Sequence, residues 1–418
     1  MLELFPDSAR IETGELTLGG IPASELAERF GTPLVVYCAR TIRERARDVR
    51  DAAPDALIAY GSKAFPNVAV MQLLANEGLA VDVSSLGELA FARAAGLDGE
   101  RLLVHGNAKS DEELRAAAEI GATVVLDGED ESARAAAAGV RRVLVRLTLG
   151  VEADTHEAIR TGHHGSKFGL PPDAAVQAVK HARELGLDVA GLHVHVGSQL
   201  ADVSAHLATI ERLAAFAARC RDELGWTPAV VDVGGGFAVR HVVEEPAVDL
   251  GAAVRSVIGA VGRSWEAAGL PAPQLVVEPG RALVGGAGVT LYRVRSVKHL
   301  PDVTWVAVDG GMSDNPRPPL YGARYTALSA TRADEPRDMT VSIAGVHCES
   351  GDVLIDDVAL PTPAPGDLLA VPATGAYVLA LSSNYNANPR PAAVLVDDGD
   401  ARLIRRRETI DDLLALEA

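Results

Sequence analysis

Cysteine is scarce in this sequence. Three residues, Cys38, Cys220 and Cys348, are spread over 418 positions. Three scattered cysteines are too few for a disulfide framework, and their spacing fits no zinc cluster. Each cysteine therefore has to be explained singly, and no metal site is expected from them.

Positive charge is also in short supply. The 39 Lys and Arg residues are outnumbered by 57 Asp and Glu residues, which gives a formal net charge of −18 at pH 7. This charge repels polyanions over most of the surface, so nucleic acid and anionic membranes are not expected as partners. A small-molecule ligand is the better expectation.

Long apolar runs are missing as well. No run approaches the ~18 residues that span a bilayer. The first ten residues carry Glu3, Asp7 and Arg10, where a secretory signal needs an apolar core. We therefore expect a cytoplasmic protein without a membrane partner. With 48% hydrophobic and 23% charged residues, the composition is that of an ordinary globular chain.

Short apolar runs alternate with helical patterns from about residue 55 to 281. Helical segments such as Pro66 to Glu77 and Pro172 to Leu185 repeat apolar residues at three- and four-residue spacing, and Ser110 to Glu113 forms a capping box. The eight apolar runs are Ala56–Tyr60, Leu79–Val83, Arg101–His105, Thr123–Asp127, Val143–Leu147, Val189–His195, Ala229–Val233 and Gln274–Glu278.

Eight strand and helix units in this length predict an α/β fold with one (β/α)₈ barrel. A pair of doubly wound sheets is the structural alternative, but it would need a linker in the middle, and no Pro/Ser-rich break occurs there. Beyond Arg281 the helical pattern gives way to short β-branched runs separated by Pro, Gly and Asp, with Asp397 to Gly399 as a hairpin signal.

That change predicts a second, all-β domain. We expect residues 31–283 to form the barrel and residues 284–418 the β domain, with residues 1–30 joining the β domain. In a barrel of this type the reactive groups lie at the C-terminal ends of the strands.

The strand ends therefore define a candidate site without any alignment. They carry Lys63, Asp82, His105, Asp127, Arg146, the segment 193–198 with two histidines, the triplet 234–236 of three glycines, and the segment 278–281. One lysine among carboxylates, a flat imidazole and two Gly-rich turns favour a phosphate-bearing aromatic aldehyde bound as a Schiff base. Pyridoxal phosphate is the candidate that fits.

Each of these groups also has an ordinary structural explanation. Lys63 could form the Schiff base because burial and nearby cations lower a lysine's pKa, yet most strand-end lysines are solvated charges. Gly235, Gly236 and Gly280 let backbone N–H groups approach a phosphate, helped by the Ser198 hydroxyl, although a glycine triplet is more often a tight turn.

Glu278 ends an apolar strand, where a charge is awkwardly buried. Against a pyridine nitrogen its carboxylate would keep that nitrogen protonated; an ion pair with Arg281 is the alternative. His195 could stack on a cofactor ring, whereas His193 and His195 together could bind a metal, as in metal-dependent hydrolases. Such a hydrolase has no evident use for Lys63 or the glycines.

The stretch Thr155 to His164 is expected to form a mobile flap.

Seven motifs in order then resemble one known family. They are YGSKAF (60–65), HVHVGSQ (193–199), VDVGGGF (231–237), VEPGRA (277–282), VDGGMSDNPRPPLYGARY (308–325), HCESGD (347–352) and ATGAY (373–377). The chain from about residue 30 to its end resembles diaminopimelate decarboxylase, a fold-type III pyridoxal-phosphate enzyme that makes L-lysine from meso-diaminopimelate. Where many relatives read YALKAN, this chain reads YGSKAF, which leaves the lysine untouched.

The resemblance implies a role for each matching residue. It makes Lys63 the Schiff-base lysine, His195 the ring-stacking residue, Glu278 the partner of the pyridine nitrogen and Cys348 the proton donor. The phosphate side would comprise Ser198, Gly235, Gly236, Gly280, Arg281 and Tyr377, and the substrate would be held by Arg281, Arg317, Tyr321, Glu349 and Tyr377. It also implies a homodimer with shared active sites, in which Cys348 and Glu349 reach the partner's barrel.

The resemblance also indicates the substrate. Two arginines and a glutamate suit a distal amino-carboxylate, because guanidinium binds carboxylate in a bidentate manner and the glutamate takes the ammonium. Ornithine lacks that carboxylate. We therefore expect decarboxylation of meso-diaminopimelate to L-lysine and CO₂. Another basic amino-acid decarboxylase on the same fold is the alternative, then a racemase. A catalytically silent relative would be expected to lack Lys63 or Cys348.

Overall fold

The computed structural model describes residues 1–151 and 166–417. The expected flap, Thr155 to His164, lies outside the described residues. The chain divides into two compact units. One comprises Arg45–Ala238 and Val248–Ala282, and the other comprises Met1–Glu44, Val239–Ala247 and Leu283–Ala418. Each unit is described by itself.

The first unit is a closed barrel of parallel strands, which confirms the predicted fold class. The strands pair in the order β10-β11-β12-β5-β6-β7-β8-β9. Their bounds are β5 (Leu57–Gly61), β6 (Ala80–Val83), β7 (Leu102–Val104), β8 (Thr123–Leu126), β9 (Arg142–Leu147), β10 (Asp188–Val194), β11 (Val230–Asp232) and β12 (Gln274–Val277). All eight predicted runs are therefore barrel strands.

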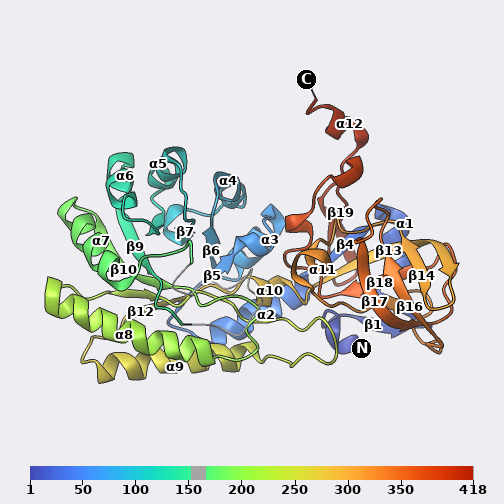
Figure 1. Ribbon diagram of the computed structural model, residues 1–418, viewed down its shortest axis with the longest axis horizontal. Helices are drawn as coiled ribbons and strands as arrows, with labels where there is room; N and C mark the ends of the chain where they lie inside the picture. The colour runs from blue at the N-terminus through green and yellow to red at the C-terminus, as the bar shows by residue number, and fades with distance from the viewer. Residues whose placement is uncertain (152–165, 418) are drawn as a thin grey trace. The chain divides into compact units, whose positions relative to one another are not determined.

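Helices follow the strands and surround the barrel (Figure 1). They are α3 (Val68–Asn76), α4 (Leu86–Ala94), α5 (Asp111–Ile120), α6 (Glu131–Ala138), α7 (Pro172–Glu184), α8 (Ser204–Leu224) and α9 (Leu250–Ala267). The start of α5 is fixed by the predicted capping box: the Ser110 side chain accepts from the Glu113 backbone, and the Glu113 side chain accepts from the Ser110 backbone.

Small and branched apolar residues fill the barrel, one from each strand. This core cluster is Ala59, Ala80, Leu103, Val125, Leu144, Ala190, Val230 and Val276, with Leu57 packed against it. Barrel strands are buried on both faces, so they appear in the sequence as nearly continuous apolar runs. The packed interior leaves the strand ends as the place for a ligand.

The second unit is built mainly from one mixed sheet. Its main path runs β17-β16-β14-β13-β4-β19-β20, and β18 pairs with β13 and β15. The strands are β4 (Leu34–Cys38), β13 (Gly288–His299), β14 (Thr304–Val308), β15 (Leu328–Ser329), β16 (Met339–Ala344), β17 (Val353–Leu360), β18 (Leu368–Pro372), β19 (Ala392–Asp397) and β20 (Asp400–Arg405). The predicted hairpin joins β19 to β20.

Smaller elements complete the two units. A three-stranded sheet comprises β1 (Arg10–Glu12), β2 (Glu15–Leu18) and β3 (Ile21–Pro22). The remaining helices are α1 (Ala23–Phe30), α2 (Ala39–Ala52), α10 (Arg281–Val284), α11 (Arg317–Tyr321) and α12 (Ile410–Leu414). None of the helices in residues 1–151 and 166–417 is long and apolar enough to cross a membrane.

The structure draws the domain boundary elsewhere than at residues 31–283. Strand β4 lies in that predicted barrel range, yet it pairs with β13 and β19 of the second unit. Residues 239–247 also belong to the second unit. All five residues of β4 are buried, so its sequence has the same apolar character as a barrel strand. Only its long-range pairing assigns it to the mixed sheet.

Candidate active site

The polar residues of the barrel gather at the C-terminal ends of its strands. Lys63 lies in a short 3₁₀ turn, Ser62–Ala64, directly after β5. The other strands contribute Asp82, His105, Asp127, Arg146, His193, Asp232 and Glu278, each at or just beyond a strand end. All seven are less than 9% exposed. Parallel barrel strands bring these ends to one rim, which explains why residues far apart in sequence meet here.

Lys63 faces a buried carboxyl group. Its Nζ lies 3.6 Å from Oδ2 of Asp82, and its side chain is 48% exposed. Burial raises the pKa of Asp82, against the opposing charges of His105 and Lys63. The lysine therefore has an electrostatic partner on the barrel side, and about half of its side chain is exposed.

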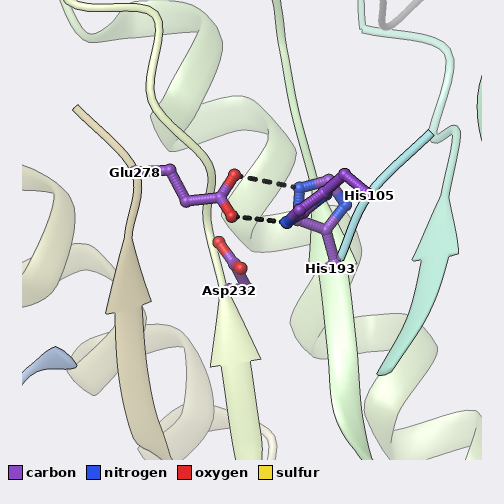
Figure 2. Close-up of side chains that lie close together, drawn as sticks. All are labelled: His105, His193, Asp232 and Glu278. Carbon is purple, nitrogen blue, oxygen red and sulfur yellow. Dashed lines mark ion pairs between the residues drawn. The ribbon is translucent and has the colours of Figure 1, made fainter. Parts of the chain in front are cut away.

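Glu278 lies at the centre of a compact buried cluster (Figure 2). One carboxylate oxygen, Oε1, lies 2.7 Å from Nε2 of His105, and the other, Oε2, lies 3.5 Å from Nε2 of His193. The two imidazole rings meet edge to face with centroids 4.9 Å apart. Asp232 points toward the same carboxylate from β11. The Glu278 carboxylate is thus approached by the imidazole nitrogens of His105 and His193 and by the carboxyl group of Asp232.

The cluster holds its negative charge on Glu278. Burial alone would raise the pKa of Glu278, but the charge of His105 and the hydrogen-bonding contacts of His105 and His193 prevail, and this pKa lies well below its usual range. Burial lowers the pKa of His193 to about 3, so its ring is neutral at pH 7. Burial and the charge of Glu278 raise the pKa of Asp232.

A metal ion is the other chemistry that such a cluster could serve. The ligand atoms of His105, His193, Asp232 and Glu278 all lie within 4.8 Å of one another. However, the two imidazoles already contact Glu278, and Oδ1 of Asp232 accepts from the Gly234 N–H at 2.9 Å. A bound ion would have to replace these contacts. His195, the other half of the predicted metal pair, is not part of the group.

The glycine turn after β11 comes very close to other backbone segments. Gly234 and Gly236 have φ of 70° and 98°, which favours glycine. A Cβ on Gly235 would lie 2.0 Å from the Glu278 carbonyl oxygen, and one on Gly236 would lie 2.4 Å from the Gly197 carbonyl oxygen. Nδ1 of His195 accepts from the Gly235 N–H at 3.3 Å. The sequence thus builds a tight glycine turn that no larger residue could form.

Arg281 and Ser198 lie together on the same unit. Nη2 of Arg281 donates to Oγ of Ser198 at 3.3 Å, and Arg281 is 8% exposed. Gly280 packs against the turn before Lys63, where a Cβ would lie 2.8 Å from the Gly61 carbonyl oxygen. A guanidinium, a hydroxyl and glycine amides together make a set of donors suited to a phosphate.

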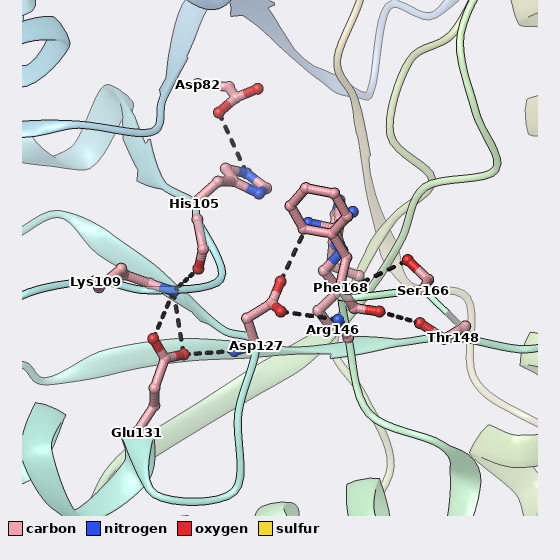
Figure 3. A network of polar contacts seen from close by, with 12 residues as sticks. Asp82, His105, Lys109, Asp127, Glu131, Arg146, Thr148, Ser166 and Phe168 are labelled. Carbon is pink, nitrogen blue, oxygen red and sulfur yellow. Dashed lines mark hydrogen bonds and ion pairs between the residues drawn. The ribbon is translucent and has the colours of Figure 1, made fainter. Parts of the chain in front are cut away.

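A second buried network lies beside this cluster (Figure 3). Nη1 of Arg146 lies 3.2 Å from Oδ2 of Asp127, and Oδ1 of Asp127 accepts from the Gly169 N–H at 2.8 Å. The Arg146 guanidinium stacks on the ring of Phe168, 4.6 Å from its centroid. These contacts hold residues 166–170 against the ends of β8 and β9.

Lys109 extends this network through a buried ion pair. Its Nζ lies 3.1 Å from both carboxylate oxygens of Glu131, and Oε2 of Glu131 also accepts from the Asp127 N–H at 2.6 Å. Because it is buried and fully paired, Lys109 serves the packing of the strand ends. Lys63 therefore differs from Lys109 in being exposed.

The second unit carries the remaining predicted residues. Arg317 begins α11 and is 5% exposed; its Nη1 lies 2.8 Å from Nε2 of His241 and also contacts the Tyr325 hydroxyl. Tyr321 ends the same helix and is half-buried. Tyr377 is half-buried and has a positive φ of 58°.

Cys348 is an exposed free thiol on a well-anchored loop. Its backbone N–H donates to Oδ1 of Asn386 at 3.3 Å, and the preceding N–H, of His347, donates to the buried Asp352 at 2.8 Å. Glu349 follows and is exposed. Cys38 and Cys220 are buried, as apolar side chains in the core.

The barrel thus brings together Lys63, His195, Ser198, Gly235, Gly236, Glu278, Gly280 and Arg281, all from one unit. Cys348, Arg317, Tyr321, Glu349 and Tyr377 belong to the other unit. Sequence analysis assigned no role to Asp82, His105 or Asp232, although the strand-end rule already pointed to the first two. Asp232 shows one further signal, a carboxyl group placed inside an otherwise apolar strand before three glycines.

The residues present fit pyridoxal phosphate. The glycine turn is a cradle that any Cβ would fill, Glu278 is a buried carboxylate with a pKa well below its usual range, and Lys63 is an exposed lysine beside Asp82 at the same rim. Comparison with known proteins gives the class. Residues 39–285 match the family of pyridoxal-dependent decarboxylases, over its pyridoxal binding domain.

Full-length relatives narrow the class further. A diaminopimelate decarboxylase of Actinosynnema pretiosum subsp. auranticum is 47% identical over 421 residues, covering 99% of this chain and 95% of that protein. One from Bacillus subtilis is 43% identical over 430 residues, covering 99% and 98%. The solved structure of a diaminopimelate decarboxylase from M. jannaschii with L-lysine has a TM-score of 0.91 at 32% identity, covering 99% and 98%. The chain belongs to the diaminopimelate decarboxylase family.

Proposed function

We propose that this protein decarboxylates meso-2,6-diaminopimelate to L-lysine and CO₂ with pyridoxal phosphate as cofactor. The observation that carries the proposal is that an exposed Lys63, 3.6 Å from Asp82, and a buried Glu278 whose pKa lies well below its usual range belong to the same barrel rim, in a chain of the family just described. In the reaction the bond between one α-carbon and its carboxylate breaks, and a proton takes the place of the carboxylate.

Lys63 is the residue that bonds the cofactor. Its exposed amine is the strand-end nucleophile, and Asp82 at 3.6 Å orients it. When bound, pyridoxal phosphate supplies an electron sink for the pair of electrons released as CO₂ leaves. Glu278 holds the proton of the ring nitrogen by accepting a hydrogen bond from it, which requires the ionised carboxylate described above. His195 would stack on the ring of the bound cofactor.

The glycine turn and its neighbours hold the phosphate. Gly236 and Gly280 offer backbone donors, Gly235 lets the turn pack closely, and Ser198 and Arg281 add a hydroxyl and a positive charge. Tyr377 is assigned to the same group. Arg281 is assigned to the substrate as well as to the phosphate.

Residues of the second unit recognise the substrate. Arg317 pairs with the distal carboxylate, Glu349 takes the distal ammonium, and Tyr321 and Tyr377 complete the pocket. The buried contacts of Arg317 with His241 and Tyr325 support this assignment, since they fix the guanidinium before a substrate arrives.

Cys348 donates the proton that replaces the carboxylate. It is an exposed thiol held by backbone contacts, and a thiol that must stay reduced supports a cytoplasmic location. The proposal includes a homodimer with shared active sites, in which Cys348 and Glu349 of one subunit serve the barrel of the other.

The test combines spectroscopy with product analysis. The purified protein with bound pyridoxal phosphate is expected to absorb in the visible and to convert meso-diaminopimelate to CO₂ and L-lysine in equal amounts. A protein that binds the cofactor but decarboxylates ornithine faster would overturn the substrate. A protein without visible absorbance after incubation with the cofactor would overturn the class of reaction.

A further inference from the structure

Both oxygens of the Glu278 carboxylate are contacted by imidazole nitrogens of the barrel (Figure 2). His105 follows β7 and His193 lies on β10, so the two rings come from strands on different sides of β12 in the barrel order. His105 is 7% exposed and His193 is 1% exposed. The shorter contact is that of His105, at 2.7 Å against 3.5 Å.

The same nitrogen of His105 also faces a second carboxyl group. Its Nε2 lies 3.7 Å from Oδ1 of Asp82, and Oδ2 of Asp82 lies 3.6 Å from Nζ of Lys63. A continuous line of polar groups therefore runs from Lys63 through Asp82 and His105 to Glu278. It joins the two residues on which the proposed chemistry depends.

A buried carboxylate without partners takes up a proton, because the charged form is costly in an apolar surrounding. Asp232 illustrates this outcome in the same cluster: burial and the nearby charge of Glu278 raise its pKa. Glu278 is as deeply buried as Asp232 but ionised. The difference lies in the contacts, because two imidazoles approach the Glu278 carboxylate, whereas the single hydrogen bond from the Gly234 N–H to Asp232 does not offset burial and the charge of Glu278.

We propose that His105, assisted by His193, is a positioning residue that keeps Glu278 ionised and aimed at the ring nitrogen of the cofactor, and that couples it to Lys63 through Asp82. The inference rests on the proposed function, since it gives His105 a task only if Glu278 serves the ring nitrogen. If His105 served packing alone, its removal would have the same effect whether or not residue 278 carries a charge.

A double-mutant cycle on the full-length enzyme separates these two cases. The variants are His105→Leu, His105→Gln, Glu278→Gln and the double variant His105→Leu/Glu278→Gln. His181→Gln, an exposed histidine on α7, is the matched control. Three quantities are measured: the Kd of pyridoxal phosphate for the cofactor-free protein, kcat on meso-diaminopimelate, and the unfolding temperature.

We expect His105→Leu to raise the cofactor Kd and to lower kcat, each by about ten- to hundredfold, as for loss of a hydrogen bond to a charged group. In the Glu278→Gln background the same change should alter either quantity by less than about threefold, because the two residues act as one unit. His105→Gln retains a donor at the position of Nε2 and should recover most of both losses. His181→Gln should match the parent.

Two results would overturn the inference. Equal losses in both backgrounds would show that His105 supports the fold and not Glu278, while the proposed function would stand. Unchanged cofactor affinity and kcat in Glu278→Gln alone would remove Glu278 from the ring nitrogen, and so would overturn that part of the proposed function together with the inference. If His105→Leu fails to fold, the cycle is run with His193→Leu, whose longer contact predicts a smaller loss.

Discussion

The Lys63 ammonium lies 3.6 Å from Oδ2 of Asp82, and the two side chains differ in exposure, at 48% and 3%. The carboxyl group is fixed inside the barrel rim, whereas the lysine can turn toward an entering ligand. Lys109 is a buried lysine near a strand end, and its ammonium contacts both carboxylate oxygens of Glu131. Exposure thus distinguishes Lys63, the lysine proposed to bond the cofactor, from the buried Lys109.

The first prediction follows from this difference. Lys63→Ala should lower kcat by about three orders of magnitude or more, because it removes the amine that attacks the cofactor's carbonyl. Treatment with borohydride should fix the cofactor to the parent protein but not to the variant, as measured by mass spectrometry. Lys180→Ala, an exposed lysine 3.9 Å from Glu184, is the control. A cofactor still fixed to the Lys63→Ala chain would contradict the assignment.

The second prediction concerns Asp314, a buried residue of the second unit. It accepts from the Tyr292 hydroxyl at 2.6 Å and from the Gly311 N–H at 2.7 Å. Burial raises the pKa of Asp314 to about 6, against the lowering effect of these two hydrogen bonds. Because this pKa exceeds the ordinary value of about 4, protonation stabilises the fold. That contribution is complete below about pH 4 and is lost as the pH rises through about 6.

The side chain in the Asp314→Asn variant cannot ionise, so the variant does not lose this stability as the pH rises. Between pH 4.5 and pH 7 the free energy of unfolding of the variant should therefore rise relative to the parent by about 2 kcal/mol. Urea unfolding at several pH values measures the difference, with Glu28→Gln, an exposed carboxylate on α1, as the control. A difference that does not vary with pH would show that Asp314 titrates as it does in the unfolded chain.

Sequence reasoning located the barrel because its strands are buried on both faces and therefore appear as apolar runs. It misplaced β4 for the same reason, since all five residues of Leu34–Cys38 are buried in the mixed sheet. Which sheet a buried run joins depends on pairing partners that are far away in the chain. The local sequence pattern does not identify these pairing partners.

The candidate site was predictable in part. Strand-end position alone pointed to Lys63, His105 and Glu278, because a barrel gathers these ends at one rim. Which of them touch depends on strand register and side-chain direction, and these are tertiary properties. The contact between His105 and Glu278 therefore emerged only from the structure, as did the role of Asp232 beneath the glycine turn.

The third prediction tests the shared active site. Lys63→Ala chains and Cys348→Ala chains should each be inactive alone. If subunits share sites, one of the two sites in a mixed dimer has both groups intact, so mixing should restore about a quarter of the parent activity at full exchange. Subunit exchange is checked by native mass spectrometry with one chain isotopically labelled. Verified exchange without recovered activity would mean that each subunit carries a self-contained site.

The last prediction concerns substrate choice, through the buried contact between Arg317 and His241. Nη1 of Arg317 lies 2.8 Å from Nε2 of His241, and the guanidinium also contacts the Tyr325 hydroxyl. A guanidinium fixed in this way can pair with a carboxylate at little cost in conformational entropy. Meso-diaminopimelate has a distal carboxylate and ornithine has none. The arginine should therefore favour the first substrate alone.

Arg317→Ala should lower kcat/KM for meso-diaminopimelate by about two to three orders of magnitude, as expected when one partner of a buried charge pair is removed. The value for ornithine should change little. Arg317→Lys keeps the charge but not the planar fork, so its loss should be intermediate. Arg324→Ala, whose side chain is 66% exposed beside Glu244, is the control. Equal losses of kcat/KM on both substrates, or a lowered unfolding temperature that accounts for them, would show that Arg317 supports the second unit and does not recognise the substrate.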